Sequence, residues 1–89
     1  MPIISQFYGI IIRIYFKDTE KHHLEHIHAQ YNEYDAVYSL KDVNLLEGTL
    51  PSKQNNLVIA WIEIHKDELL ALWKLSQEDG EFFKIDPLK

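Results

Sequence analysis

The first third of the chain alternates between apolar and polar positions with the period of a β-strand. In residues 9–16, every second position carries a large apolar side chain: Ile10, Ile12, Ile14 and Phe16. Successive side chains of a strand point to opposite faces, so these four share one face. The pattern therefore predicts a largely buried strand over this segment, which we expect to be the central strand of a sheet.

Turn-forming residues divide the next part of the chain into further short strands. Residues 17–23 are polar without apolar period and predict an exposed connection. Asn32-Glu33 separates residues 26–31 from residues 34–40, which favours a β-hairpin, and residues 41–44 form another turn before residues 45–49. Consecutive short strands predict an antiparallel meander of about four strands within residues 3–49.

The second half of the chain changes to a helical period. Pro51-Ser52 opens a stretch without glycine or proline that lasts until Gly80, which predicts one long helix over about residues 52–77. Its apolar stripe recurs at spacings of three and four: Val58, Trp61, His65, Leu69, Leu72 and Leu75. Further apolar residues widen the stripe beyond one face: Ile59, Ile62, Ile64 and Trp73. The helix should therefore lie in the groove of a curved sheet or contact a second subunit, which predicts a homodimer or a small protein partner. A bend near residues 65–67 is the alternative to one straight helix.

Together these patterns predict an α+β fold in a single domain of residues 1–89. An antiparallel meander of about four strands should pack against one long C-terminal helix. Residues 81–85 could add a short final edge strand, and residues 80–89 form a tail.

Composition narrows the classes of function. The net charge of −5 argues against binding a nucleic-acid backbone over a wide surface. The absence of cysteine excludes disulfides and thiolate chemistry and is compatible with a reducing compartment. The longest apolar run, residues 57–62, is too short to span a bilayer. We therefore expect a cytoplasmic protein without a membrane role.

Three histidines are the candidate chemical groups. His26 and His28 are two residues apart on one predicted strand face, which we expect to be partly solvated, and His65 lies on the predicted helix. Convergence of the three would create a metal site, for a divalent metal such as zinc, or a catalytic site. The alternative is that His26 and His28 are polar surface positions of a hairpin. His65 would then donate from the edge of the core to a carbonyl or carboxylate oxygen.

Two other readings of the same region stay open. A metal-free nuclease would use a histidine as general acid or base, with Arg13 stabilising a phosphate. A binding surface would instead use Arg13 with Tyr31, Tyr34 and Tyr38, since tyrosine is enriched at binding sites, although tyrosines on a hairpin also stabilise cross-strand pairs. No complete catalytic signature is present, so enzymatic activity is left open.

An ordered set of short motifs resembles a known family. The motifs are Met1-Pro2-Ile3-Ile4-Ser5, Phe7-Tyr8-Gly9-Ile10, Tyr15-Phe16-x-Asp18, His26-Ile27-His28-Ala29-x-Tyr31, Gly48-x-Leu50-Pro51 and Trp61-x3-His65-x2-Glu68-Leu69-x3-Trp73. Nearly end to end, the chain resembles the small bacterial and archaeal proteins called domain of unknown function 4160. These are often encoded beside a protein of the domain of unknown function 2442 family, in arrangements similar to toxin–antitoxin modules, which implies a small protein partner.

Two departures from the family pattern bear on function. Leu24-Glu25 stands where the family usually has Pro-Pro, and Gln6 stands where it usually has arginine. Both changes weaken a nucleic-acid role carried over from the family. The favoured hypothesis is therefore an interaction component of a toxin–antitoxin-like two-gene module. The alternative is a histidine-based hydrolase or ribonuclease, with or without a metal, that uses His26, His28 and His65.

Overall fold

The computed structural model of the protein describes residues 2–15 and 24–89. In this part of the chain, five strands are followed by two helices: β1 (Ile3–Phe7), β2 (Ile10–Arg13), β3 (His26–Tyr31), β4 (Tyr34–Ser39), β5 (Leu45–Gly48), α1 (Ser52–Ile64) and α2 (Lys66–Glu78). The α+β class predicted from the sequence is confirmed. Phe16 and the predicted connection at residues 17–23 lie outside the described residues.

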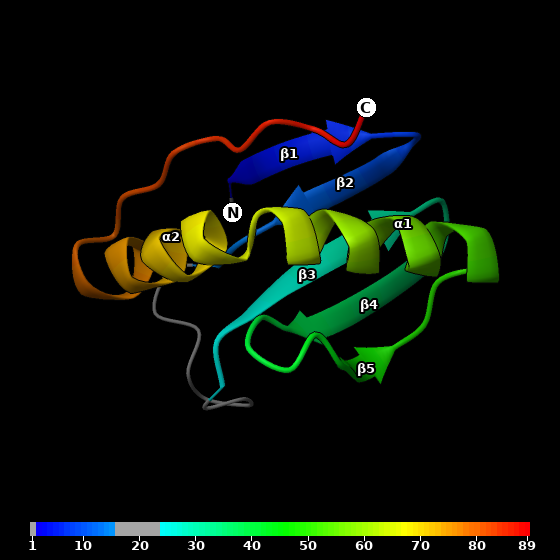
Figure 1. The fold of residues 1–89 in the computed structure, drawn as a ribbon, viewed down its shortest axis with the longest axis horizontal. Helices are drawn as coiled ribbons and strands as arrows, with labels where there is room; N and C mark the ends of the chain where they lie inside the picture. Colours follow the sequence, from blue (N-terminus) through cyan, green and yellow to red (C-terminus); the bar gives the residue numbers. More distant parts are fainter. Residues whose placement is uncertain (1, 16–23) are drawn as a thin grey trace.

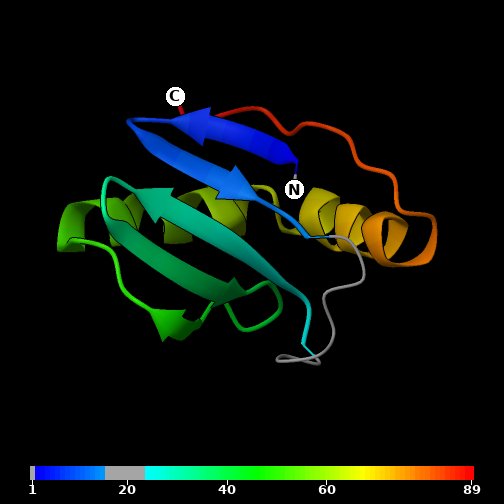
Figure 2. The same cartoon turned by 180° about the vertical axis from the view of Figure 1, so that it is seen from behind.

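The five strands form one sheet in the order β1-β2-β3-β4-β5, and every neighbouring pair is antiparallel. This is the predicted meander, since each strand pairs with the next one along the chain. Both helices lie across the same face of the sheet, and within residues 2–15 and 24–89 no helix covers the opposite face (Figures 1 and 2). The molecule therefore has two layers, with one sheet face left open.

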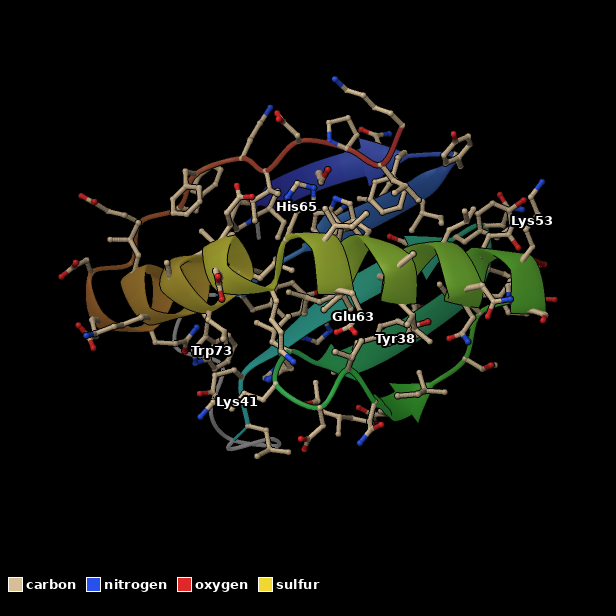
Figure 3. All side chains as sticks on the ribbon, viewed as in Figure 1. Tyr38, Lys41, Lys53, Glu63, His65 and Trp73 are labelled. Carbon is tan, nitrogen blue, oxygen red and sulfur yellow. The ribbon has the colours of Figure 1, made fainter. Side chains whose placement is uncertain are left out.

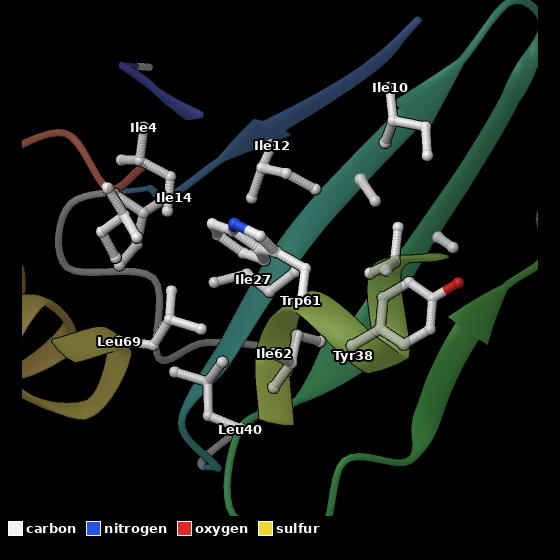
Figure 4. Close-up of a cluster of buried hydrophobic side chains, with 14 of the residues drawn as sticks. Ile4, Ile10, Ile12, Ile14, Ile27, Tyr38, Leu40, Trp61, Ile62 and Leu69 are labelled. Atoms are coloured by element: carbon white, nitrogen blue, oxygen red, sulfur yellow. The ribbon is translucent and has the colours of Figure 1, made fainter. Parts of the chain in front are cut away.

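The core lies between the helices and the sheet (Figure 4). The alternating set Ile10, Ile12 and Ile14 is fully buried there, as its period predicted. From the helical side the core receives four residues of the predicted stripe: Val58, Trp61, Leu69 and Leu72. The hydrophobic period of each half of the chain therefore identified the faces that meet.

The prediction of one long helix was wrong, because the helix breaks at His65. This residue leaves helical geometry with φ −108° and ψ 21°, separating two helices of 13 residues each. Its N–H donates to the Trp61 carbonyl at 3.0 Å, and its carbonyl accepts from the Leu69 N–H at 2.9 Å, so it ends one helix and starts the next. The break changes the course of the helix across the twisted sheet (Figure 1). Of the apolar residues beside the stripe, Ile62 is fully buried in the core, Ile59 and Trp73 pack partly against it, and Ile64 stays 65% exposed.

The strand predictions need two corrections. There are five strands rather than about four, because residues 3–7 form β1 at one edge, and the central strand is β3 rather than the segment from Ile10. The proposed final strand at residues 81–85 does not form. Instead, residues 81–89 cross back beside β1, and the Ile85 N–H donates to the Ile4 carbonyl at 2.8 Å.

In the described part of the chain, no helix is long and apolar enough to cross a membrane.

Candidate functional site

The face of the sheet turned away from the helices carries the candidate site. Strand register places Arg13 opposite His28, His28 opposite Val37, and Val37 opposite Glu47. Directly opposite residues of neighbouring strands share a face and have Cβ atoms about 5 Å apart. These four side chains therefore form a row that crosses β2, β3, β4 and β5 in turn.

A second row lies beside the first, because Ile11 is opposite Gln30 and Gln30 is opposite Asp35. The two rows line a groove of about 570 Å³ on the open face. Its polar side chains are Arg13, Tyr15, His28, Gln30, Asp35 and Glu47. The β2 end of the groove carries one cation, Arg13, and the β4–β5 end carries two carboxylates, Asp35 and Glu47, so the groove has a net negative charge.

The imidazole of His28 is held between two other rings. Its centroid lies 4.1 Å from that of Tyr15 and 5.2 Å from that of His26. The His26 ring in turn lies 4.8 Å from the Trp73 ring of α2. His28 therefore lines the groove with its ring packed against two other aromatic rings.

His26 is not the accessible imidazole that the strand period predicted. It is only 1% exposed, and its Nδ1 lies 2.8 Å from the Leu24 carbonyl oxygen. A carbonyl oxygen only accepts, so Nδ1–H is the donor of this bond. Strand alternation showed that His26 and His28 share a face, but it could not show that Trp73 of α2 would pack against the first of them. His26 is therefore a buried side chain whose ring packs against that of His28.

The entry to β3 is fixed by Glu25, which with Leu24 forms one of the two departures from the family pattern. Its carbonyl accepts the Leu40 N–H at 2.9 Å, and its carboxylate lies 3.3 Å from the Lys41 Nζ. A backbone hydrogen bond, helped by Lys41, holds the pKa of Glu25 below its usual value. Two prolines would restrict the segment before His26 sterically. In this chain, the hydrogen bonds of Glu25 hold the segment instead.

His65 lies apart from the other two histidines, at the junction of α1 and α2 (Figure 3). Its Nδ1–H donates to the Glu68 carboxylate at 2.8 Å, and its ring packs 5.5 Å from that of Trp61. Across residues 2–15 and 24–89, no group of three or more His, Cys, Asp or Glu side chains is placed to hold a metal ion. Among these described residues, His26, His28 and His65 therefore do not form such a group. His22 and His23 lie outside the described residues.

The predicted tyrosine surface is also divided by the fold. Tyr38 is fully buried, and its hydroxyl donates to Asn55 Oδ1 at 2.7 Å. Tyr31 and Tyr34 face each other beside the β3–β4 turn, outside the groove, and only Arg13 of the predicted set lines the groove. Sequence reasoning missed Tyr15, Gln30 and Glu47; the signal available for the first two was their two-residue spacing from Arg13 and His28.

Burial of Tyr38 predicts a loss of stability at alkaline pH. Desolvation raises the pKa of its phenol from 10.0 to about 12. Below pH 10 both states keep the proton, and between about pH 10 and 12 only the unfolded state releases it, so the free energy of unfolding falls as pH rises. We expect this group to remove about 2–3 kcal/mol over that interval.

Urea unfolding at several pH values measures this slope, with Tyr38→Phe as the control. The variant loses the bond to Asn55 and should be less stable at pH 7, yet its stability should fall less steeply above pH 10. Equal slopes for the two proteins would show that Tyr38 is not the titrating group.

Comparison with known proteins adds one match. A family described as "Domain of unknown function (DUF4160)" matches residues 9–74. No curated protein and no solved structure matches the chain. The matched region begins in the β1–β2 turn and ends within α2, so it includes every residue that lines the groove.

Proposed function

Because this chain belongs to the DUF4160 family, whose description assigns no activity, we propose a function from its surface: a cytoplasmic binding component that holds a small protein partner on the open face of its sheet. One observation carries the proposal. An antiparallel sheet needs only one covered face, and here the uncovered face is not a uniform charged surface but a groove of about 570 Å³. Such concave sites are where ligands and partner segments bind.

The composition of the groove fits a protein partner. Val37 and the partly buried Ile11 provide an apolar floor, and polar side chains surround it. A buried apolar centre with a polar rim is the usual anatomy of protein interfaces. Arg13 and Tyr15 at the β2 end belong to the residue types that most often dominate binding energy.

The proposed partner is the second member of a two-gene module of the toxin–antitoxin type. Support comes from the family resemblance, in which neighbouring genes encode a small protein, and from the groove, which offers that protein a surface. The acidic balance of the chain, with a net charge of −5, is consistent with a protein rather than a nucleic acid as the partner.

A histidine-based hydrolase or ribonuclease is the second candidate, and one observation favours it. His28 lies opposite Arg13 and against Tyr15, so a general base and a phosphate-binding cation occur side by side. Asp35 and Glu47 in the same groove repel a polyanion, and His65 lies elsewhere. Binding of a protein partner is therefore the favoured function, and catalysis is the second candidate.

Paired Ile→Arg substitutions test the binding surface. Ile11→Arg puts a second cation beside Arg13 at the β2 end of the groove, whereas Ile64→Arg puts the same side chain on the exposed side of α1. We expect Ile11→Arg to weaken binding of the small protein encoded beside this gene by about tenfold or more, and Ile64→Arg to leave it unchanged. Calorimetric titration measures both, with circular dichroism to verify folding.

The reverse ranking, with Ile64→Arg the more damaging change, would move the interface to the helices and overturn the proposal. Hydrolysis of single-stranded RNA by the wild type that is lost in His28→Gln and kept in His65→Gln would establish the second candidate instead.

A further inference from the structure

The outer edge of β1 is only partly occupied. Residues 81–89, here called the C-terminal strap, run beside β1 and in the same direction (Figures 1 and 2). The Ile85 side chain is 3% exposed in the core, and the Trp61 Nε1–H donates to the Asp86 carbonyl at 2.8 Å. Among the described residues, a single backbone hydrogen bond joins the strap to the strand, from the Ile85 N–H to the Ile4 carbonyl.

The register of β1 shows which backbone groups point outward. Phe7 and Ile10 flank the two-residue turn and form a hydrogen-bonded pair, so Phe7 and Ser5 direct their backbone groups toward β2. Gln6 therefore directs its backbone groups away from the sheet. Ile4 lies at an irregularity in the β1–β2 register, and its carbonyl is turned outward, because it accepts the bond from the strap. Within the described residues, the N–H and C=O of Gln6 have no backbone partner.

Pro87 explains why the strap stops pairing. In a ladder, every second residue directs its backbone N–H and C=O toward the neighbouring strand. The next residue of the strap after Ile85 that would face β1 in this way is Pro87. Proline has no N–H to donate, so the strap cannot bond the Gln6 carbonyl. The strap therefore covers this edge without completing it, which protects an edge strand against uncontrolled pairing.

A pocket of about 280 Å³ remains between the strap and β1, lined by residues 3–6 and 84–87. Ser5 belongs to this pocket, is 6% exposed, and its Oγ has no hydrogen-bond partner. A buried hydroxyl without a partner is unfavourable, so the site combines an unsatisfied side chain with unpaired backbone groups.

We propose that the outer edge of β1 binds an extended strand of a partner protein, which displaces the C-terminal strap. The chemistry of the edge specifies the occupant: an aliphatic side chain that replaces Ile85 in the core, followed two residues later by a residue that, unlike proline, donates its N–H to Gln6. Addition of a strand to an exposed sheet edge is an established mode of peptide recognition. The proposal is independent of the groove, which lies on the open face.

Two synthetic peptides provide the test: residues 81–89 in the native sequence, and the same peptide with Pro87→Val. The tethered strap competes at high effective concentration, so the full chain carries Ile85→Ala to weaken it. We expect the Pro87→Val peptide to bind about tenfold tighter than the native peptide, because it forms further backbone bonds with Gln6. Fluorescence anisotropy measures binding, and hydrogen exchange of the Gln6 amide should slow only with the Pro87→Val peptide.

Gln6→Pro is the matched control, because proline is tolerated in an edge strand where the N–H faces outward. Because it removes the N–H of residue 6 but keeps the carbonyl that accepts from residue 87, it should weaken binding of the Pro87→Val peptide while keeping that peptide the tighter of the two, whereas Ile11→Arg in the groove should change neither affinity. If Ile85→Ala does not fold, Leu88→Ser weakens the strap more mildly and replaces it. Equal affinity for both peptides, binding of neither, or formation of a β1–β1 homodimer in place of peptide binding would each overturn the proposal.

Discussion

Gly48→Ala is expected to lower the free energy of unfolding by about 3–5 kcal/mol, from a left-handed backbone together with a steric clash. Gly48 has φ +70°, and a Cβ built on it would lie 2.1 Å from the Asp35 carbonyl oxygen and 3.2 Å from the Ala36 Cα. Both neighbours are backbone atoms of β4, so they cannot rotate aside as a side chain would. An alanine therefore forces β5 away from β4 or changes the backbone at this position.

Gly80→Ala is the matched control for this prediction. Gly80 has φ +66°, but a Cβ there would meet nothing within 4 Å, so only the backbone term applies, about 1 kcal/mol. Urea unfolding followed by circular dichroism measures both variants. Similar losses in the two would mean that the close approach between β4 and β5 does not contribute. Because Gly48 also lines the groove, we expect its substitution to weaken partner binding as well.

Trp61→Ala is expected to cost about 3–5 kcal/mol, the usual range for removing a large buried aromatic side chain. Trp61 is fully buried, and its ring centroid lies 5.3 Å from that of Phe7. Its indole N–H also holds the strap through the Asp86 carbonyl. The substitution therefore opens a cavity between α1 and the sheet and removes one attachment of residues 81–89.

The conservative change Trp61→Phe separates these two contributions. It keeps an aromatic ring in the core but removes the indole N–H, so hydrogen exchange of the Ile85 amide should accelerate while most of the stability remains. Trp73→Phe is the control, since the Trp73 ring contacts His26 rather than the strap. Acceleration at Ile85 in both variants would indicate general loosening instead of release of the strap.

The elements whose apolar residues recur at a regular spacing were predicted correctly from the sequence. Alternation identified Ile10, Ile12 and Ile14 as core residues, and the spacings of three and four identified Trp61 and Leu69 on the helices. Asn32-Glu33 predicted the hairpin, because turn residues between two apolar strands leave few other arrangements. The family was also predicted correctly, on the order and spacing of short motifs along the chain.

Elements without such a pattern were predicted less well. The break at His65 has no proline or glycine to mark it, so the sequence offered a bend near residues 65–67 only as an alternative to one long helix. The sequence predicted an edge strand over residues 81–85. In the structure, Ile85 is buried in the core and Pro87 cannot donate to β1, so this segment forms a single backbone bond to the sheet.

By itself, the sequence determined the α+β class, the meander and the sides of strands and helices that form the core. It also determined that His26 and His28 lie on the same face of one strand. Only the tertiary structure decided that Trp73 packs against His26, that His65 stands apart, and that Arg13, His28 and Glu47 form one row. The physical reason is that periodicity is a property of one element, whereas a groove or a site depends on cross-strand register and on which layer covers each face.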